Sequence, residues 1–175
     1  MNLFTFICII FLSLQIQAQH NYNSIKISAA DVPPDVLETF HNNYPHDEVK
    51  QWEKLTRTYE NLTYNKYVAM MVEEGLITRA RIKEDGTPLT STTYFRGKHR
   101  NKLPSNITRY AEENYPDLKL MEVEKILLFD DNSTYYRIFL QKGVDYKYLY
   151  VNLAGELLDE TTIPIKVKED DAWAE

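Results

Sequence analysis

The segment VPPDVLETFHNNYP at residues 32–45 returns in altered form as LPSNITRYAEENYP at residues 103–116. The matching positions share an offset of 71 (104 − 33); they are Pro33 with Pro104, Tyr44-Pro45 with Tyr115-Pro116, and Glu53-Lys54 with Glu124-Lys125. Three matched blocks at one offset indicate a tandem duplication of one unit. Two copies differ from a solenoid, which needs at least three repeats.

Each copy begins with the pattern of a short helix. A proline near the first helical position favours a helix start, and Tyr-Pro ends it because proline disfavours the α conformation of the preceding residue. Apolar residues recur between these signals at helical spacing. They are Val32, Val36, Leu37 and Phe40 in the first copy, and Ile107, Tyr110 and Ala111 in the second.

Strand patterns follow each predicted helix. They cover residues 49–55, 63–72, 76–82 and 89–95 in the first copy, and 120–129, 134–140, 146–151 and 157–163 in the second. The turns between them, such as Asp85-Gly86, are too short for parallel crossover connections. The sequence therefore predicts an α+β fold of two tandem repeats. Each repeat is one helix followed by an antiparallel meander of three to four strands, with the helices on one face of the sheet.

The start of the chain reads as a secretory signal peptide over residues 1–19. Residues 3–16 are apolar and uncharged, and Ala18 is a suitable small residue before a cut. The run is shorter than the roughly 20 residues that span a membrane. No Lys or Arg precedes it, and a buried N-terminal helix is the alternative. Cys8 is the only cysteine, so the mature chain would have no disulfide and no cysteine nucleophile.

The remaining chain divides by pattern into five segments. We expect an N-terminal lead at 20–30, a first repeat at 31–95, a basic linker at 96–102, a second repeat at 103–165 and a charged tail at 166–175. The net charge is −6. An acidic protein disfavours nucleic acid and anionic membranes as partners.

Catalytic and metal-binding patterns find no support in the sequence. It contains no Gly-x-Ser-x-Gly and no Ser-x-x-Lys motif. His41 and His46 lie five positions apart, whereas a helical zinc pair prefers three or four. The prediction is therefore a non-enzymatic protein with no cofactor and no metal.

A row of tyrosines is the most distinctive surface candidate. Tyr146, Tyr148 and Tyr150 alternate along one strand and so point to one face, while Leu149 and Val151 point to the other. Tyr94 and Tyr136 lie on other strands and could join the row. These five tyrosines are the predicted partner-binding surface, because tyrosine offers a large rigid area with a polar tip. A cross-strand ladder that only stabilises the sheet is the alternative.

The duplicated blocks resemble a family of exported bacterial proteins described as beta-lactamase-inhibitor-like or PepSY-like. The resemblance rests on Val32-Pro33…Val36, Tyr44-Pro45 and Asp85-Gly86, and on Leu103-Pro104…Ile107, Tyr115-Pro116 and Ala154-Gly155. It implies two α+β repeats sharing one antiparallel sheet and a location in the periplasm or outside a Gram-negative cell. It brings no catalytic motif, and its inhibitor label describes fold similarity. The second copy departs from the first, because Val123 stands where the first has Trp52.

These observations predict an exported binding or inhibitor-like module. Its partner would be a protein or peptide of the envelope or the extracellular space, and no membrane span would remain after signal cleavage. Two alternatives stay open: a structural or stress-related envelope protein with no discrete ligand, and a hydrolase or metal-dependent enzyme.

Overall fold

The computed structural model describes residues 21–59 and 62–168. The predicted signal peptide, and residues 169–175 of the predicted tail, lie outside the described residues. Within the described chain, the tail segment begins as a short helix, α4, at Ile165–Lys168.

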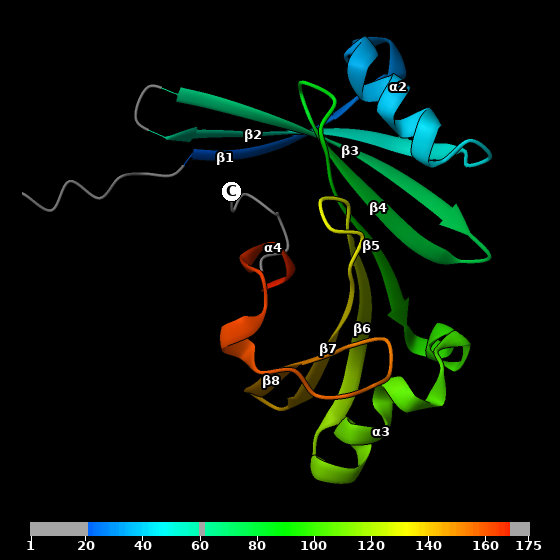
Figure 1. Cartoon of the computed structure of the whole chain (residues 1–175), viewed down its shortest axis with the longest axis vertical. Helices are drawn as coiled ribbons and strands as arrows, with labels where there is room; N and C mark the ends of the chain where they lie inside the picture. The colour runs from blue at the N-terminus through cyan, green and yellow to red at the C-terminus, as the bar shows by residue number, and fades with distance from the viewer. Residues whose placement is uncertain (1–20, 60–61, 169–175) are drawn as a thin grey trace, which may run out of the picture.

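One antiparallel sheet of eight strands, paired in chain order, forms the body of the protein. Its strands are β1 (Asn21–Ile27), β2 (Val49–Tyr59), β3 (Leu62–Glu73), β4 (Leu76–Lys83), β5 (Pro88–Arg96), β6 (Lys119–Leu128), β7 (Thr134–Lys142) and β8 (Asp145–Val151). Two ten-residue helices accompany it, α2 (Pro34–Asn43) and α3 (Ser105–Asn114). The predicted α+β class is confirmed, and the pairing of β5 with β6 makes the sheet continuous across both copies (Figure 1).

Three segments differ from the sequence-based assignment. The lead at 20–30 contains β1, which pairs along the whole of its length with β2. The linker at 96–102 includes a 3-10 helix, η2 (Gly97–Lys102). The strand predicted at 157–163 is wrong: beyond one bridge from Leu157 to Val151, this segment forms a 3-10 helix, η3 (Glu160–Thr162).

The failed strand has a local physical cause. The Asp159 side chain accepts a hydrogen bond from the backbone N–H of Thr161 at 2.8 Å, which turns the backbone away from the extended conformation. Pro164 follows directly and has no N–H to give to a ladder. Residues 158–168 therefore leave the sheet and cross one of its faces.

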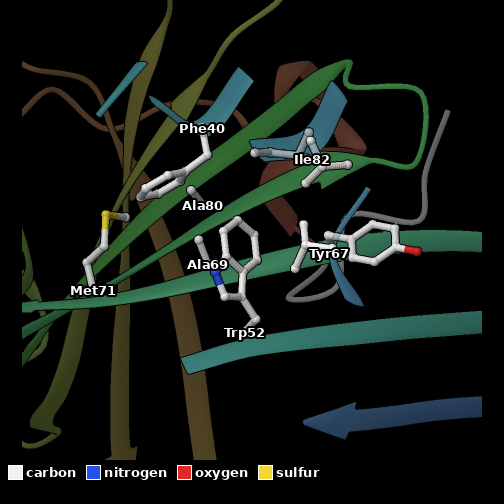
Figure 2. Packing of buried hydrophobic residues seen from close by; sticks show 9 residues of the cluster. Phe40, Trp52, Tyr67, Ala69, Met71, Ala80 and Ile82 are labelled. Carbon is white, nitrogen blue, oxygen red and sulfur yellow. The ribbon is translucent and has the colours of Figure 1, made fainter. Parts of the chain in front are cut away.

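The two faces of the sheet are covered differently. Strand register places Trp52, Ala69 and Ala80 on one face, and the same alternation continues through β5 to Val123 and Ile138. We call this the helix face, because both helices pack on it. Helix α2 packs Val36 and Phe40 into the first core cluster, where Figure 2 shows Phe40 beside Trp52 and Ala80. Helix α3 packs Ile107 and Ala111 into the second core cluster. On the opposite face, Ile163 and Val167 pack against Ile126, Leu128 and Tyr150. Figure 1 shows α4 on the side of the sheet away from α2 and α3.

The duplicated positions make the same local bonds in both copies. Tyr44 and Tyr115 are the C-caps of their helices, so the predicted helix ends are confirmed. One residue earlier, the side-chain amide of Asn43 donates to the carbonyl of Thr39 at 2.8 Å, and that of Asn114 donates to the carbonyl of Tyr110 at 2.9 Å. The repeated Asn-Tyr-Pro therefore ends both helices with the same side-chain hydrogen bond, from the Asn amide to the carbonyl four residues earlier.

Candidate binding surface

The exposed tyrosines of β8 form a compact aromatic cluster with a phenylalanine of β7. The two-residue turn Gly143-Val144 sets Phe139 directly opposite Tyr148. Their rings stack at a centroid distance of 5.1 Å, and Tyr146 meets the edges of both at 6.3 Å and 5.9 Å. We call Phe139, Tyr146 and Tyr148 the aromatic cluster. Tyr146 keeps 67% and Tyr148 43% of its surface exposed, so the cluster is packed within itself and open to solvent.

An ion pair fixes the inner side of this cluster. The guanidinium of Arg137 lies 5.5 Å from the centroid of the Tyr148 ring. Arg137 donates to the Glu124 carboxylate at 2.7 Å through Nε, and both side chains are buried. A cation held in place over a ring orients that ring at little cost in side-chain entropy. Tyr148 is thus presented in one arrangement, with 43% of its surface exposed.

The edge of β8 also leaves backbone groups open. In a strand, alternate residues direct their N–H and C=O groups to the same side. The carbonyl of Tyr150 accepts from the N–H of Leu158 at 2.8 Å, on the side away from β7. The backbone groups of Tyr148 and Tyr146 point the same way, and β8 is the last strand of the sheet. The aromatic cluster therefore sits beside a short sheet edge able to accept another strand.

The predicted row of five tyrosines needs correction at two positions. Tyr150 points to the face of the row but is 6% exposed, because Ile163 and Val167 cover it. Tyr136 is wrong as a member: it pairs with Val151, lies on the helix face and belongs to the buried core beneath α3. Tyr94 shares the face of the row, half-buried, with the guanidinium of Arg96 at 5.2 Å from its ring. It lies three strands from Tyr150 and apart from the aromatic cluster.

Three contributors were missed by the sequence analysis. They are Phe139, Arg137 and Val144, the last of which is 92% exposed at the hairpin tip. The signal that identifies them was present, because a two-residue turn at Gly143-Val144 fixes every pair of the hairpin, including Phe139 with Tyr148 and Arg137 with Tyr150.

Four buried tyrosines have raised pKa values, which a pH titration can measure. Burial raises the pKa of Tyr44, Tyr67, Tyr136 and Tyr150 above the ordinary 10.0. The folded state therefore favours their neutral form, and this stabilising contribution is complete below pH 10 and is lost as the pH rises through the raised values. We expect absorbance at 295 nm to show a late-titrating group of tyrosines, with melting temperatures falling as the pH rises above the ordinary tyrosine pKa of about 10. Tyr150→Phe should remove part of the late phase, and its persistence unchanged would contradict the burial of Tyr150.

A groove lies on the helix face, where the two copies meet. This groove has a volume of about 340 Å³ and a mixed lining of Tyr44, Asp47, Met71, Glu73, Thr78, Ser91, Thr93, Lys125, Leu127 and Thr134. The hydroxyls of Thr78 and Thr93 bond each other at 2.9 Å. Two of the lining side chains therefore already satisfy each other.

No group of three or more His, Cys, Asp or Glu side chains in residues 21–59 and 62–168 is placed to hold a metal ion. His41 and His46 are both exposed. None of the helices in the same ranges has the length and apolar character needed to cross a membrane.

The sequence and the fold are both similar to those of known bacterial proteins. A sequence profile described as "Putative beta-lactamase-inhibitor-like, PepSY-like" matches twice, at residues 17–76 and 99–159. Among solved structures, a BLIP-like protein from Bacteroides fragilis is 20% identical, with a TM-score of 0.56 over 71% of this chain and 82% of its own. A DUF2874 family protein from Bacteroides ovatus is 17% identical, with a TM-score of 0.57 over 74% of this chain and 86% of its own.

A third structure is described as a "putative periplasmic protein" from Bacteroides eggerthii. It is 16% identical, with a TM-score of 0.53 over 73% of this chain and 86% of its own. At these identities the likeness shows a shared fold. A search of curated proteins finds no match.

Proposed function

Because the chain belongs to the PepSY-like, beta-lactamase-inhibitor-like family, we propose that it is an exported, non-enzymatic module that binds a protein or peptide partner in the periplasm. The uncharged apolar run at residues 3–16 supports export. The periplasmic description of the Bacteroides eggerthii protein agrees with that location. Each copy of the duplicated unit contributes one helix and its following strands to the scaffold that presents the binding surface.

The exposed aromatic cluster at the free edge of β8 carries this proposal. Large aromatic side chains at the centre of an interface supply most of the binding free energy in many complexes, and tyrosine is among the commonest of them. Here Tyr146 and Tyr148 combine large exposed area with a fixed geometry, so little side-chain entropy is lost when a partner covers them. The adjacent backbone edge can add main-chain hydrogen bonds to an extended partner segment.

A structural role without a discrete ligand is the second candidate. The burial of Tyr136 and Tyr150 favours it, because these two members of the predicted row stabilise the core. The same reading does not account for Tyr146 or for Val144, which are the most exposed large apolar side chains of the β7–β8 hairpin. Exposed apolar groups gathered in one place are typical of interaction sites.

Substitution within the cluster tests the binding proposal. The purified chain, and a variant with Tyr146→Ala and Tyr148→Ala, would be immobilised and exposed to an envelope extract of the producing cells. We expect the double variant to lose the captured partner, with an affinity at least about 30-fold weaker, since a hot-spot aromatic contributes about 2 kcal/mol or more.

The matched control is Tyr64→Ala, which removes a tyrosine of similar exposure, 41%, from β3 in the first copy. Its binding should equal that of the unaltered chain. Equal capture by the double variant would contradict the aromatic cluster as the binding site. Failure of the unaltered chain to capture any protein above the bare matrix would favour the structural role.

A further inference from the structure

The outer edge of β8 is open over part of its length. β8 is the last strand of the sheet. Its C-terminal end is already used, because the Tyr150 carbonyl accepts from the N–H of Leu158 at 2.8 Å and Val151 forms a bridge with Leu157. Among the described residues, no strand pairs with the outer side of residues 145–149. This open stretch is where a further strand can be added.

The side chains of this open stretch define the strand that would fit it. In an antiparallel pair, residues directly opposite each other lie on the same face and interact. Tyr146 and Tyr148 lie on the face of the aromatic cluster, whereas Asp145 and Lys147 are exposed charges on the helix face. An apolar residue suits the position opposite each tyrosine, an acid the position opposite Lys147 and a base the position opposite Asp145. Read along its own direction, the added strand is therefore apolar, acidic, apolar, basic.

The chain contains this pattern at the same edge, as Val144-Asp145-Tyr146-Lys147. We propose that two molecules of this protein associate through their β8 edges, antiparallel and centred on Tyr146. Asp145 then lies opposite the partner's Lys147, and Lys147 lies opposite the partner's Asp145. The inference rests on the proposed function, because it names a second molecule of the same chain as the partner of that same edge.

The directions of the backbone groups agree with this register. The outward carbonyl of Tyr150 shows that the even-numbered residues of β8 direct their N–H and C=O groups away from β7. Tyr146 and the partner's Tyr146 therefore face each other as a pair that exchanges both N–H···O=C bonds. Positions 145 and 147 form the pairs without backbone bonds, in which side chains lie closer together. The two ion pairs thus form where opposite side chains are nearest.

The neighbouring registers are less favourable. Moving the centre by one residue keeps the faces matched, but it sets Lys147 opposite the partner's Lys147 in one direction and Asp145 opposite the partner's Asp145 in the other. Like charges directly opposite each other destabilise a strand pair. A centre at Tyr148 would set Tyr146 opposite the partner's Tyr150, whose carbonyl is already bonded to Leu158. Charge and backbone bonding therefore select the register centred on Tyr146.

The resulting dimer is symmetric, with a two-fold axis perpendicular to the sheet. The two sheets join into one, with the aromatic clusters of both molecules on one face and the α3 helices of both on the other. Each molecule closes the open edge of its partner, which removes a template for uncontrolled strand pairing. One short strand pair buries little area compared with a permanent dimer, so we expect a reversible dimer that depends on concentration.

Charge reversal at positions 145 and 147 tests this register. The measurement is sedimentation velocity of the purified chain over micromolar to millimolar concentrations, and the unaltered chain should show a monomer–dimer equilibrium. Asp145→Lys makes both positions basic and Lys147→Glu makes both acidic, so each variant should dimerise at least about 10-fold more weakly. An equimolar mixture of these two variants should recover the dimer, because every base again lies opposite an acid. The double variant, which exchanges the two charges within one chain, should dimerise like the unaltered chain.

Lys98→Glu is the matched control, since it makes the same change of charge at an exposed position of η2. It should leave the dimerisation constant unchanged. Circular dichroism of each variant verifies its fold, and the double variant, which keeps the net charge, decides the question if a single variant does not fold. An unaltered chain that stays monomeric at millimolar concentration would overturn the proposal. So would a mixture of the folded single variants that does not associate, or a folded double variant that stays monomeric.

Failure of this inference is distinguishable from failure of the proposed function, because the two tests alter side chains on opposite faces of β8. A monomeric chain whose capture of an envelope protein still depends on Tyr146 and Tyr148 would overturn the dimer and keep the binding proposal. A dimer that follows the charge series, while Tyr146→Ala with Tyr148→Ala still captures the envelope protein, would confirm the inference. That second result would contradict the aromatic cluster as the site of the capture.

Discussion

Phe40→Ala is expected to lower the free energy of unfolding by about 3–5 kcal/mol. Phe40 has no exposed surface and is the central side chain of α2 in the first core cluster. Its ring stacks on Tyr44 at 5.3 Å. It also meets Trp52 edge-on at 5.4 Å, and Figure 2 shows these two rings side by side. Alanine would leave a cavity bordered by two large rings and by the strands beneath, which cannot all move inward together.

Urea unfolding followed by circular dichroism measures this loss. Tyr64→Ala again serves as control, because it also truncates an aromatic side chain to alanine, but at an exposed position. Its effect should stay within about 0.5 kcal/mol. Comparable losses in the two variants would show that Phe40 is not the anchor of the first core.

The second copy would not respond in the same way, since it is built from different volumes. Ala111 stands at the position of Phe40 and Val123 at that of Trp52, each at the offset of 71. The second core cluster instead contains Phe95, Tyr136 and Leu140 as its large buried side chains from the strands. The two copies therefore keep ten-residue helices at matching positions while their cores are built from different side chains.

Part of the fold was predictable from the sequence, because the repeated blocks carry local structural signals. Helix starts, the Asn-Tyr-Pro ends and most strands depend on local rules, namely proline chemistry and the alternation of side chains. They were predictable from the repeated blocks alone. The shared sheet was implied by family resemblance and is present through the β5–β6 pairing.

The errors arose where one segment acts on another distant in sequence. Alternation within a strand shows which side chains share a face. It does not show which of those faces lines up with a given face of the neighbouring strand. Tyr136 was therefore predicted on the face opposite to the one it occupies. The burial of Tyr150 depends on Ile163, at the end of the strand predicted at 157–163, and on Val167, in the predicted tail. Residues 21–27 join the sheet through pairing with β2, which a short polar sequence does not reveal.

Gly155→Ala is expected to destabilise the fold by about 2–5 kcal/mol. Alanine substitutions at two other glycines separate the backbone penalty from the steric clash. Gly155 has φ +80°, and an added Cβ would overlap the carbonyl oxygen of Asn106 in the first turn of α3. Gly86 is its counterpart: with φ +84°, its Cβ would lie 3.0 Å from the carbonyl oxygen of Asp35 in the first turn of α2. Gly143 has φ +61° with no atom within 4 Å.

Alanine at all three positions meets the same backbone penalty, about 1–2 kcal/mol for a left-handed conformation. Only Gly155 and Gly86 add a steric term of about 1–3 kcal/mol, because the turn must move away from its helix. We therefore expect losses in the order Gly155, Gly86, Gly143, measured as free energies of unfolding in urea.

Equal losses of unfolding free energy at Gly155 and Gly143 would mean that the contact between turn and helix does not contribute to stability. The expected order would instead identify this contact as the common tie of both copies. Asp35 and Asn106 share the offset of 71, and each lies in the first turn of a helix that the glycine turn of the same copy approaches closely. The duplication would then have preserved the joint between helix and sheet, while the residues of the cores and of the exposed β8 edge diverged.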